Sequence, residues 1–193
     1  MGAVLAGGAS RRMGANKALL PWQGIPLVSR VVRLLAEAVG EVVVVTRHPA
    51  ELAGLGLPLV EDEPGPQTPL SGIRTALHLA GARPLFVAAC DMPFLSPSFV
   101  QSLLALGPAH DAVVPLHHSR PQPLHAVWLP TALPQVEASL ASGHPAPRRV
   151  LSQLTVRWVQ EDEWRPWDPG GLSFTNVNTP EDVHRTRGSW PAS

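Results

Sequence analysis

A chain of 193 residues, 45% hydrophobic and 16% charged, has enough apolar material for a sizeable core and too little charge for disorder. Its formal net charge of +0 excludes the broad basic surface that nucleic acid or an anionic membrane attracts. The single cysteine excludes an internal disulfide, which favours a reducing compartment. We therefore expect a cytoplasmic protein that binds neither nucleic acid nor membrane.

Short apolar runs alternate with helical patterns over the first 116 residues. The glycine pair Gly7-Gly8 follows the first run, and Ser71 is the expected cap of one of the helices. Continuous apolar strands separated by helices predict a parallel sheet covered on both faces. Strands are expected at 2–6, 41–46, 58–60, 84–89 and 111–116, and helices at 27–38, at 71–82 and after Ser96 or Ser98.

From about residue 117 the pattern becomes less regular. Strands are expected at 123–129 and 155–160, and a helix at 129–143. A last helix should begin at Thr179, because Pro180 and Asp182 follow at the positions of a first-turn proline and a capping acid. With no repeat and no low-complexity linker, the chain is expected to form one domain.

Three polar stretches directly follow predicted strands. These are the Gly7-Gly8 loop, Asp62 and Asp91. Ligands of open parallel sheets bind at the carboxyl ends of the strands. We therefore expect these residues to converge on one edge of the sheet.

The glycine loop carries the positive charges Arg11, Arg12 and Lys17 close behind it. Glycines allow the backbone amides to approach an anion closely. The loop matches neither the Walker A motif nor the dinucleotide GxGxxG motif. From these residues alone, a phosphate site and an ordinary turn with solvated arginines both remain open.

Five motifs together resemble a known family. The string LAGGASRRMGANKALL resembles the LAGG-x-S-x-RMG-x-x-K-x-x-L signature of nucleotidyltransferases, most closely the molybdenum cofactor guanylyltransferases. VEDEPGP…PLSGI, FVAACDMPFL, RPQPLHAVW and FTNVNTPEDV resemble later motifs of that family in the same order. The resemblance implies a Rossmann-like three-layer α/β/α nucleotidyltransferase fold with a mostly parallel sheet. It also implies a nucleotide-binding half over about 1–116 and an acceptor-side half over about 117–193.

That family transfers GMP from Mg·GTP to the terminal phosphate of molybdopterin and releases pyrophosphate. The resemblance implies that Asp91 binds Mg²⁺ and that Asn176 and Asn178 lie on the acceptor side. It makes Arg12, Lys17 and Asp91 the candidate catalytic residues. The nucleotide-binding residues that it implies are Leu5, Ala6, Gly7, Gly8, Lys17, Asp62 and Asp91.

Lys17 is the one lysine among 15 basic residues. A flexible ammonium can follow a phosphate as its charge redistributes, whereas the planar guanidinium of arginine demands a fixed geometry. The chain departs from the family pattern at three positions, of which one is next to Lys17. Asn16 replaces the usual aspartate, Thr68 the usual glycine, and Thr46 an asparagine that often follows this strand.

Two other functions stay open at this stage. One is cytidylyl transfer to molybdopterin or to another small phosphate acceptor, although the paired Gly7-Gly8 favours guanine. The other is an inactive GTP-binding regulator. The implied partners are GTP, molybdopterin and, more remotely, the proteins that deliver the cofactor or receive the product. A monomer is the default.

Other chemically suggestive residues have simpler interpretations. We expect His117, His118 and His125 to be surface or loop histidines rather than zinc ligands. We expect a buried structural thiol at Cys90 and a solvated turn at 161–163. Three tryptophans of the C-terminal region are expected to pack rather than stack on a pterin, and they are Trp158, Trp164 and Trp167.

Overall fold

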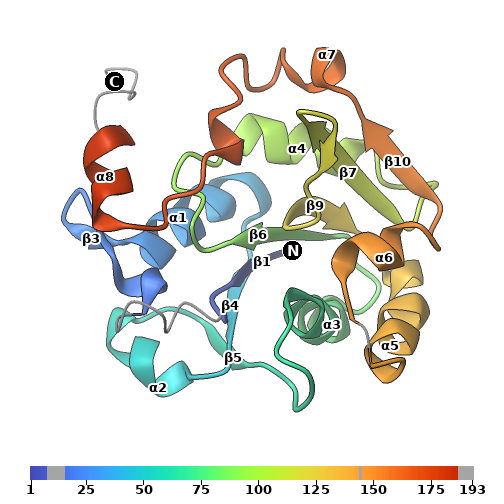
Figure 1. Ribbon diagram of the computed structural model, residues 1–193, viewed down its shortest axis with the longest axis horizontal. Helices are drawn as coiled ribbons and strands as arrows, with labels where there is room; N and C mark the ends of the chain where they lie inside the picture. Colours follow the sequence, from blue (N-terminus) through green and yellow to red (C-terminus); the bar gives the residue numbers. More distant parts are fainter. Residues whose placement is uncertain (8–15, 144, 187–193) are drawn as a thin grey trace.

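The computed structural model describes residues 1–7, 16–143 and 145–186, and its main feature is an eight-stranded mixed sheet (Figure 1). The strand order is β10-β7-β9-β6-β1-β4-β5, with β8 paired to β7. A hairpin outside this sheet consists of β2 (Pro21–Trp22) and β3 (Ile25–Pro26). The strands of the sheet are β1 (Gly2–Leu5), β4 (Val42–Thr46), β5 (Leu59–Glu61), β6 (Leu85–Ala89), β7 (Ala112–His117), β8 (Arg120–Pro121), β9 (His125–Trp128) and β10 (Val156–Val159).

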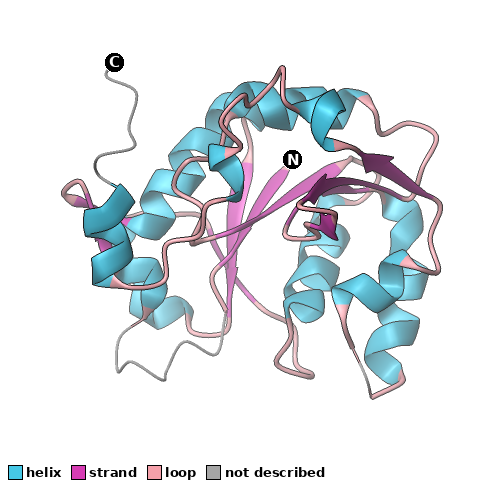
Figure 2. Cartoon of the chain, turned by 45° about the horizontal axis from the view of Figure 1, so that its top comes forward, coloured by secondary structure: helices cyan, strands magenta, loops and turns pink. Residues whose placement is uncertain are grey.

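Helices cover both faces of the sheet (Figure 2). In this arrangement α1 packs against α4 on one face, and α3 packs against α5 on the other. Short 3-10 helices occupy Lys17–Leu19, Ala53–Leu55, Pro130–Ala132 and Leu172–Phe174. The described α-helices are α1 (Leu27–Val39), α2 (Pro49–Leu52), α3 (Pro69–Ala80), α4 (Pro97–Ala105), α5 (Leu133–Ala141), α6 (Pro147–Leu151), α7 (Glu161–Trp164) and α8 (Pro180–Thr186).

The central strand β1 contributes to both halves of the core. Val4 packs into the cluster under α1 and α4, and Ala3 packs into the cluster under α3 and α5. Both residues are fully buried, as expected for a strand covered on two faces. Strands β5, β4, β1 and β6 run parallel, and β9 is antiparallel to its neighbours β6 and β7. The predicted three-layer α/β/α fold with a mostly parallel sheet is confirmed.

Several element boundaries follow from local capping chemistry, as the sequence predicts. The Ser96 hydroxyl accepts a hydrogen bond from the Phe99 amide at 3.3 Å and starts α4. Helix α1 ends at Gly40, whose φ of +76° suits a residue without a Cβ. At α8, the Thr179 hydroxyl accepts from the Asp182 amide at 3.1 Å, and the Asp182 carboxylate accepts from the Thr179 amide at 3.0 Å.

The predicted start of α3 at Ser71 is wrong. The helix begins two residues earlier at Pro69, because a proline in the first turn has the required φ and no amide to leave unpaired. Thr68 is the capping residue by backbone conformation, although its side chain makes no capping hydrogen bond. The Ser71 hydroxyl instead donates to the carbonyl of Pro66 at 2.8 Å.

The segment 161–163 is a helix rather than a solvated turn, so this prediction is also wrong. Gln160 and Glu163 form a reciprocal capping box at the start of α7. Trp164, at the end of α7, is 1% exposed and donates its indole N–H to the carbonyl of Leu116 at 2.8 Å. Trp158 and Trp167 are half-buried against the two main clusters, so packing is confirmed for all three tryptophans.

His125 is not a surface residue, and this prediction is wrong as well. It lies on β9, is 0% exposed, and its ring is surrounded by Phe86, Phe99 and Phe174 at centroid distances of 5.4, 5.2 and 5.2 Å. Neither ring nitrogen has a hydrogen-bond partner among the described residues. Burial therefore lowers the pKa of His125 from 6.5 to about 3.

The other two histidines lie near the turn between β7 and β8. His117 is half-buried and stacks on Phe174, with ring centroids 4.6 Å apart. The side chain of His118 is 79% exposed, which confirms the surface assignment. Among the described residues, no group of three or more His, Cys, Asp and Glu could hold a metal ion.

The burial of His125 predicts a loss of stability in acid. Its folded-state pKa lies far below its unfolded value, so only the unfolded chain takes up the proton between pH 6.5 and about 3. The free energy of unfolding should therefore fall through this range by up to about 1.4 kcal/mol per pH unit. His125→Leu should remove this part of the pH dependence, as measured by urea unfolding between pH 4 and 8. His118→Asn is the matched control, and identical slopes in wild type and His125→Leu would contradict the prediction.

Candidate active site

A pocket of about 350 Å³ opens where β1, β4, β5 and β6 end. Parallel strands bring their carboxyl ends to one edge of a sheet, and pockets of open α/β sheets form there. Six of the residues implied by the sequence motifs line this pocket. They are Leu5, Ala6, Gly7, Lys17, Asp62 and Asp91.

Lys17, Asp91 and Asn178 meet at the side of this pocket. The Lys17 ammonium contacts a carboxylate oxygen of Asp91 and the side-chain oxygen of Asn178. The side chains of Lys17 and Asp91 are 13% and 17% exposed, so this ion pair is largely shielded from water. An ammonium group has three donors, and these two contacts leave one of them for a further acceptor.

A small apolar cluster explains why these three residues meet although they are far apart in the sequence. Its members come from the β2–β3 hairpin, the start of α1, the segment after Asp91 and the C-terminal region. Trp22 and Phe94 pack edge to face at a centroid distance of 5.2 Å. The amide of Val177 donates to the carbonyl of Asp91 at 2.8 Å, which sets Asn178 beside Lys17. The buried members are Trp22, Leu27, Phe94, Val177 and Val183.

Asp91 has one carboxylate oxygen left to bind a cation. Oδ2 contacts Lys17, whereas Oδ1 is buried and accepts no hydrogen bond from a described residue. A buried carboxylate oxygen without a donor is costly, and Mg²⁺ is a cation that prefers such oxygens. Mg²⁺ needs only one or two carboxylates when phosphates and waters complete its shell, so Asp91 fits this ion.

Cys90 lines the pocket next to Asp91. Burial raises the pKa of its thiol to about 12, and the neighbouring Asp91 carboxylate acts in the same direction. The side chain is therefore a neutral thiol at physiological pH, and not a thiolate nucleophile. The side chain is partly buried and packs against the cluster under α1 and α4, so it has the packing role expected from the sequence without being fully buried.

Asp62 lies at the opposite wall, directly after β5. Its Oδ1 accepts a hydrogen bond from the Thr75 hydroxyl at 2.7 Å. Its Oδ2 lies 3.6 Å from Nε of Arg47, a residue that directly follows β4. The Asp62 side chain is only 8% exposed, so these two partners hold the carboxylate in one orientation.

Asn16 has a partner that explains its departure from the family pattern. Its side-chain oxygen accepts from the Ala18 amide at 3.0 Å and caps the 3-10 helix that carries Lys17. Its amide donates to Glu51 of α2 at 2.7 Å. An aspartate at position 16 would place two like charges at this distance. The negative charge at this point of the site lies on Glu51.

The other site residues predicted from the sequence do not all line the pocket. Gly8 and Arg12, like Arg11, lie outside the described residues. Asn178 contacts Lys17 as described above. Asn176 is exposed and is not among the residues that line the pocket, so the structure does not bring it to the nucleotide side.

Sequence reasoning assigned no site role to several residues at the pocket. Gln67, Thr68 and Gly72 line it from the β5–α3 connection and the first turns of α3. A Cβ on Gly72 would lie 3.0 Å from the side chain of Leu5, so this glycine permits close packing of α3 on β1. Arg47 could have been found by the rule that selected Asp62 and Asp91, because it directly follows a strand.

The fold is that of a three-layer α/β protein. At the carboxyl edge of its sheet, the pocket brings together the cation of Lys17, the carboxylate of Asp91 and the backbone of Gly7. Residues 2–164 match the family model of the MobA-like NTP transferase domain. The chain therefore belongs to the MobA-like NTP transferase family, and it is an enzyme of the nucleotidyltransferase type.

Individual relatives resemble this chain over most of its length. A probable molybdenum cofactor guanylyltransferase of Pelotomaculum thermopropionicum is 35% identical over 186 residues, covering 96% of this chain and 91% of that protein. The molybdenum cofactor guanylyltransferase of Rhodobacter capsulatus is 36% identical over 189 residues, with coverages of 95% and 93%. The crystal structure of molybdopterin-guanine dinucleotide biosynthesis protein A from Archaeoglobus fulgidus superposes with a TM-score of 0.81 at 28% identity, covering 97% of each chain.

The Asn16–Glu51 contact predicts that the hydrogen-bond donor and the acceptor can be exchanged between positions 16 and 51. Asn16→Asp alone should lower the free energy of unfolding by about 0.5–1 kcal/mol, because two carboxylates then face each other. Adding Glu51→Gln should recover most of this loss, since the amide at position 51 can donate to the carboxylate at position 16. Denaturant unfolding of the two single variants, the double variant and wild type measures the coupling. Additive effects of the two substitutions would contradict the assigned contact.

Proposed function

We propose that this protein transfers GMP from Mg·GTP to the terminal phosphate of molybdopterin, forming the guanine dinucleotide cofactor and releasing pyrophosphate. The observation that carries the proposal is the contact of Lys17 with Asp91 beside Gly7 in the pocket. It is supported by relatives named molybdenum cofactor guanylyltransferases that cover nearly the whole chain. Four of the five sequence motifs of that family contribute residues that line the pocket, and the fifth contacts Lys17 through Asn178.

The proposed reaction needs charge neutralisation and positioning more than a reactive side chain. An oxygen of the acceptor phosphate forms a bond to the α-phosphorus of GTP, the bond from that phosphorus to the bridging oxygen of the β-phosphate breaks, and pyrophosphate leaves with the electron pair. Like charges approach each other in this step, so cationic groups near the phosphates lower the barrier. No protein nucleophile is required, which agrees with the neutral thiol of Cys90.

Within this proposal, Lys17 supplies the mobile cation. Its ammonium keeps Asp91 and Asn178 as partners and directs its remaining donor to a phosphate oxygen. Asp91 holds Mg²⁺ through its unpartnered Oδ1. When bound, the ion neutralises phosphate charge and orients the triphosphate. Arg12 and Gly8, which lie outside the described residues, are proposed to complete the contacts to the nucleotide.

The two halves of the chain are proposed to divide the substrates between them. Residues 1–116 contribute the pocket residues from Leu5 to Asp91 and would hold GTP. Residues 117–193 contribute Asn178, and with it Asn176, as the proposed contacts to molybdopterin. Mg·GTP and molybdopterin are thus the proposed substrates. No helix among the described residues is long and apolar enough to cross a membrane.

Nucleotide-dependent stability tests this proposal first. Mg·GTP at about 100 times its Kd should raise the free energy of unfolding by about 2.7 kcal/mol, measured as an increase in melting temperature. Asp91→Ala should abolish the part of this increase that depends on Mg²⁺. Asp162→Ala, on the exposed side of α7, is the matched control and should behave as wild type.

The same experiment separates the alternatives. An increase specific to Mg·CTP would replace the proposal by cytidylyl transfer. An increase with Mg·GTP but no pyrophosphate release in the presence of molybdopterin would indicate a GTP-binding protein without transferase activity. The absence of an increase with any nucleotide would contradict the proposal.

Lys17→Arg is expected to impair turnover although it preserves the charge. A planar guanidinium cannot occupy the position of the ammonium between Asp91 and Asn178 and still follow the phosphate. We expect pyrophosphate release to fall about tenfold or more, equivalent to about 1.4 kcal/mol of transition-state stabilisation. Arg33→Lys, at an exposed position of α1, is the control and should keep full activity. Intact turnover in Lys17→Arg would show that the lysine is not required as such.

A further inference from the structure

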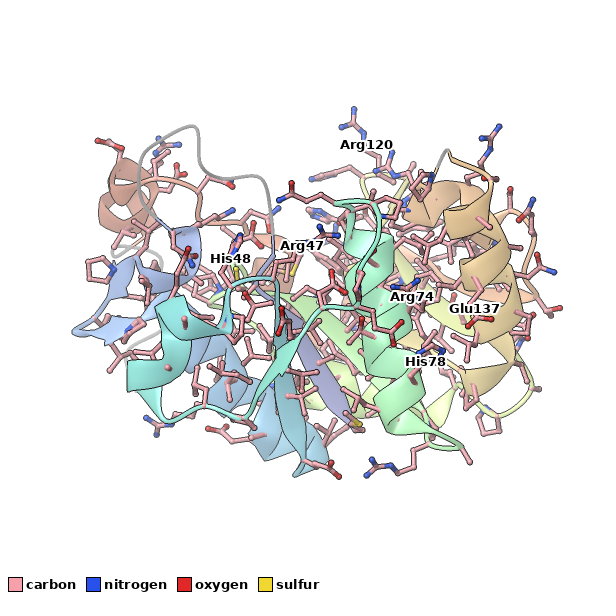
Figure 3. All side chains as sticks on the ribbon, turned by 90° about the horizontal axis from the view of Figure 1, so that it is seen from below. Arg47, His48, Arg74, His78, Arg120 and Glu137 are labelled. Atoms are coloured by element: carbon pink, nitrogen blue, oxygen red, sulfur yellow. The ribbon has the colours of Figure 1, made fainter. Side chains whose placement is uncertain are left out.

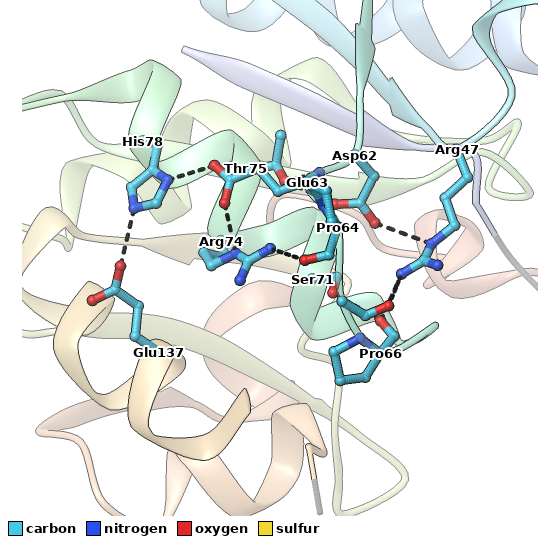
Figure 4. A network of polar contacts seen from close by, with 11 residues as sticks. Arg47, Asp62, Glu63, Pro64, Pro66, Ser71, Arg74, Thr75, His78 and Glu137 are labelled. Carbon is cyan, nitrogen blue, oxygen red and sulfur yellow. Dashed lines mark hydrogen bonds and ion pairs between the residues drawn. The ribbon is translucent and has the colours of Figure 1, made fainter. Parts of the chain in front are cut away.

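The connection between β5 and α3 forms one wall of the pocket through Asp62, Gln67 and Thr68. Prolines at positions 64 and 66 have no amide N–H, so this loop has few backbone donors with which to hold its own conformation. Its conformation depends instead on side chains that reach its carbonyl oxygens. Figure 4 shows this network of polar contacts.

Most of these side chains come from α3, the helix that the loop itself enters. Arg74 donates to the carbonyl of Pro64 at 3.2 Å, and Ser71 donates to the carbonyl of Pro66 at 2.8 Å. Thr75 accepts from the amide of Glu63 at 3.1 Å and donates to Asp62. These contacts hold the loop against α3, and the Asp62 amide joins the start of the loop to the Thr46 carbonyl of the neighbouring strand β4 at 2.8 Å, but none of them fixes the middle of the loop relative to β4.

Arg47 makes the connection to that strand. It follows β4, and its Nη2 donates to the carbonyls of Gly65 at 2.8 Å and Pro66 at 2.7 Å. Its Nε lies 3.6 Å from Oδ2 of Asp62. Figure 3 places Arg47 between the end of β4 and α3, whereas Arg74 and His78 lie along α3 itself. One guanidinium thus links the carboxylate at the start of the loop to two carbonyls at its middle.

The chemistry of this contact requires arginine. A guanidinium is planar and presents donors on different edges, so one edge can face Asp62 while another faces two carbonyls. A lysine ammonium concentrates its donors at one point and cannot span the same groups. The pairing also neutralises Asp62, so this wall does not present an unpaired negative charge to an anionic ligand.

We propose that Arg47 is a positioning residue for nucleotide binding, which holds the loop 62–68 against the end of β4 so that Asp62, Gln67 and Thr68 face the ligand. The proposal rests on the proposed function for the identity of the ligand, but the link between Arg47 and the loop stands on contacts within the protein. Arg47 acts through the loop and contacts no reacting atom.

The first test measures the loop in the absence of nucleotide. Arg47→Ala should increase hydrogen exchange at the amides of Glu63 and Thr68, which donate to the Thr75 hydroxyl at 3.1 Å and to the Pro66 carbonyl at 2.9 Å, while exchange in β1 and β6 stays unchanged. Arg33→Ala, which removes an arginine whose side chain is 71% exposed, is the matched control and should leave the loop amides as in wild type. Unchanged exchange of the loop in Arg47→Ala would overturn the proposal whatever the protein binds.

The second test measures Mg·GTP affinity and turnover separately. Arg47→Ala should weaken binding by about tenfold, as expected for loss of a charge-assisted contact, and change kcat at saturating GTP by less than about threefold. Guanidinium at about 10 mM should restore part of the affinity of Arg47→Ala and have no such effect on Arg33→Ala. Equal affinity in wild type and Arg47→Ala, or a loss confined to kcat, would overturn the positioning role.

The proposal can still be tested if Arg47→Ala does not fold or if wild type binds no nucleotide. If Arg47→Ala does not fold, Arg47→Lys carries the test, because it keeps the charge and the aliphatic stem but not the fork. It should weaken binding by about threefold to fivefold and raise exchange at the loop amides, and wild-type behaviour in both would overturn the proposal. If wild type binds no nucleotide, the proposed function fails, while the exchange experiment still decides whether Arg47 holds the loop.

Discussion

The pairing of β1 on both sides is the constraint on which the site depends. β1 runs parallel to β4 and to β6, with Leu5 opposite Val45 on one side and Ala89 on the other. The three strands therefore end at the same level, and the chain segments that leave them share one edge of the sheet. Helix α1 packs closely on β1, because a Cβ on Gly2 would lie 2.7 Å from the side chain of Leu35. The pocket is a consequence of strand register rather than of loops that fold independently.

The second level of organisation is the apolar cluster around Trp22 and Phe94. It joins the β2–β3 hairpin to the segment after Asp91 and to the start of α8. Burial of large aromatic side chains supplies more stabilisation than the polar contact of Lys17 with Asn178. The polar residues of the site are thus positioned by apolar packing that lies beside the pocket rather than within it.

The described charged side chains at the pocket form ion pairs of opposite sign. The whole chain likewise has a formal net charge of +0. Lys17 is paired with Asp91, and Arg47 with Asp62. Among the described residues, the proposed triphosphate and metal ion would therefore meet an arrangement of matched groups rather than a broad positive surface. The Asn16–Glu51 contact belongs to the same pattern, because it moves a negative charge from the lysine-bearing segment to α2 without adding one. The departure from the family pattern at position 16 is accommodated by Glu51, a neighbour that the family motifs do not include.

The sequence by itself determined the alternation of strands and helices, the cap of α4 at Ser96 and the placement of Gly7, Asp62 and Asp91 at one sheet edge. These features depend on local periodicity, local hydrogen bonds and the direction of parallel strands, all of which a single sequence displays. Only the tertiary structure decided that Lys17 contacts Asn178, that Arg47 holds the loop before α3 and that His125 is buried among three phenylalanines. Lys17 and Asn178 are 161 positions apart, and their contact depends on how distant elements pack. Local pattern carries no information about that packing, so a buried histidine and an exposed one look the same in the sequence.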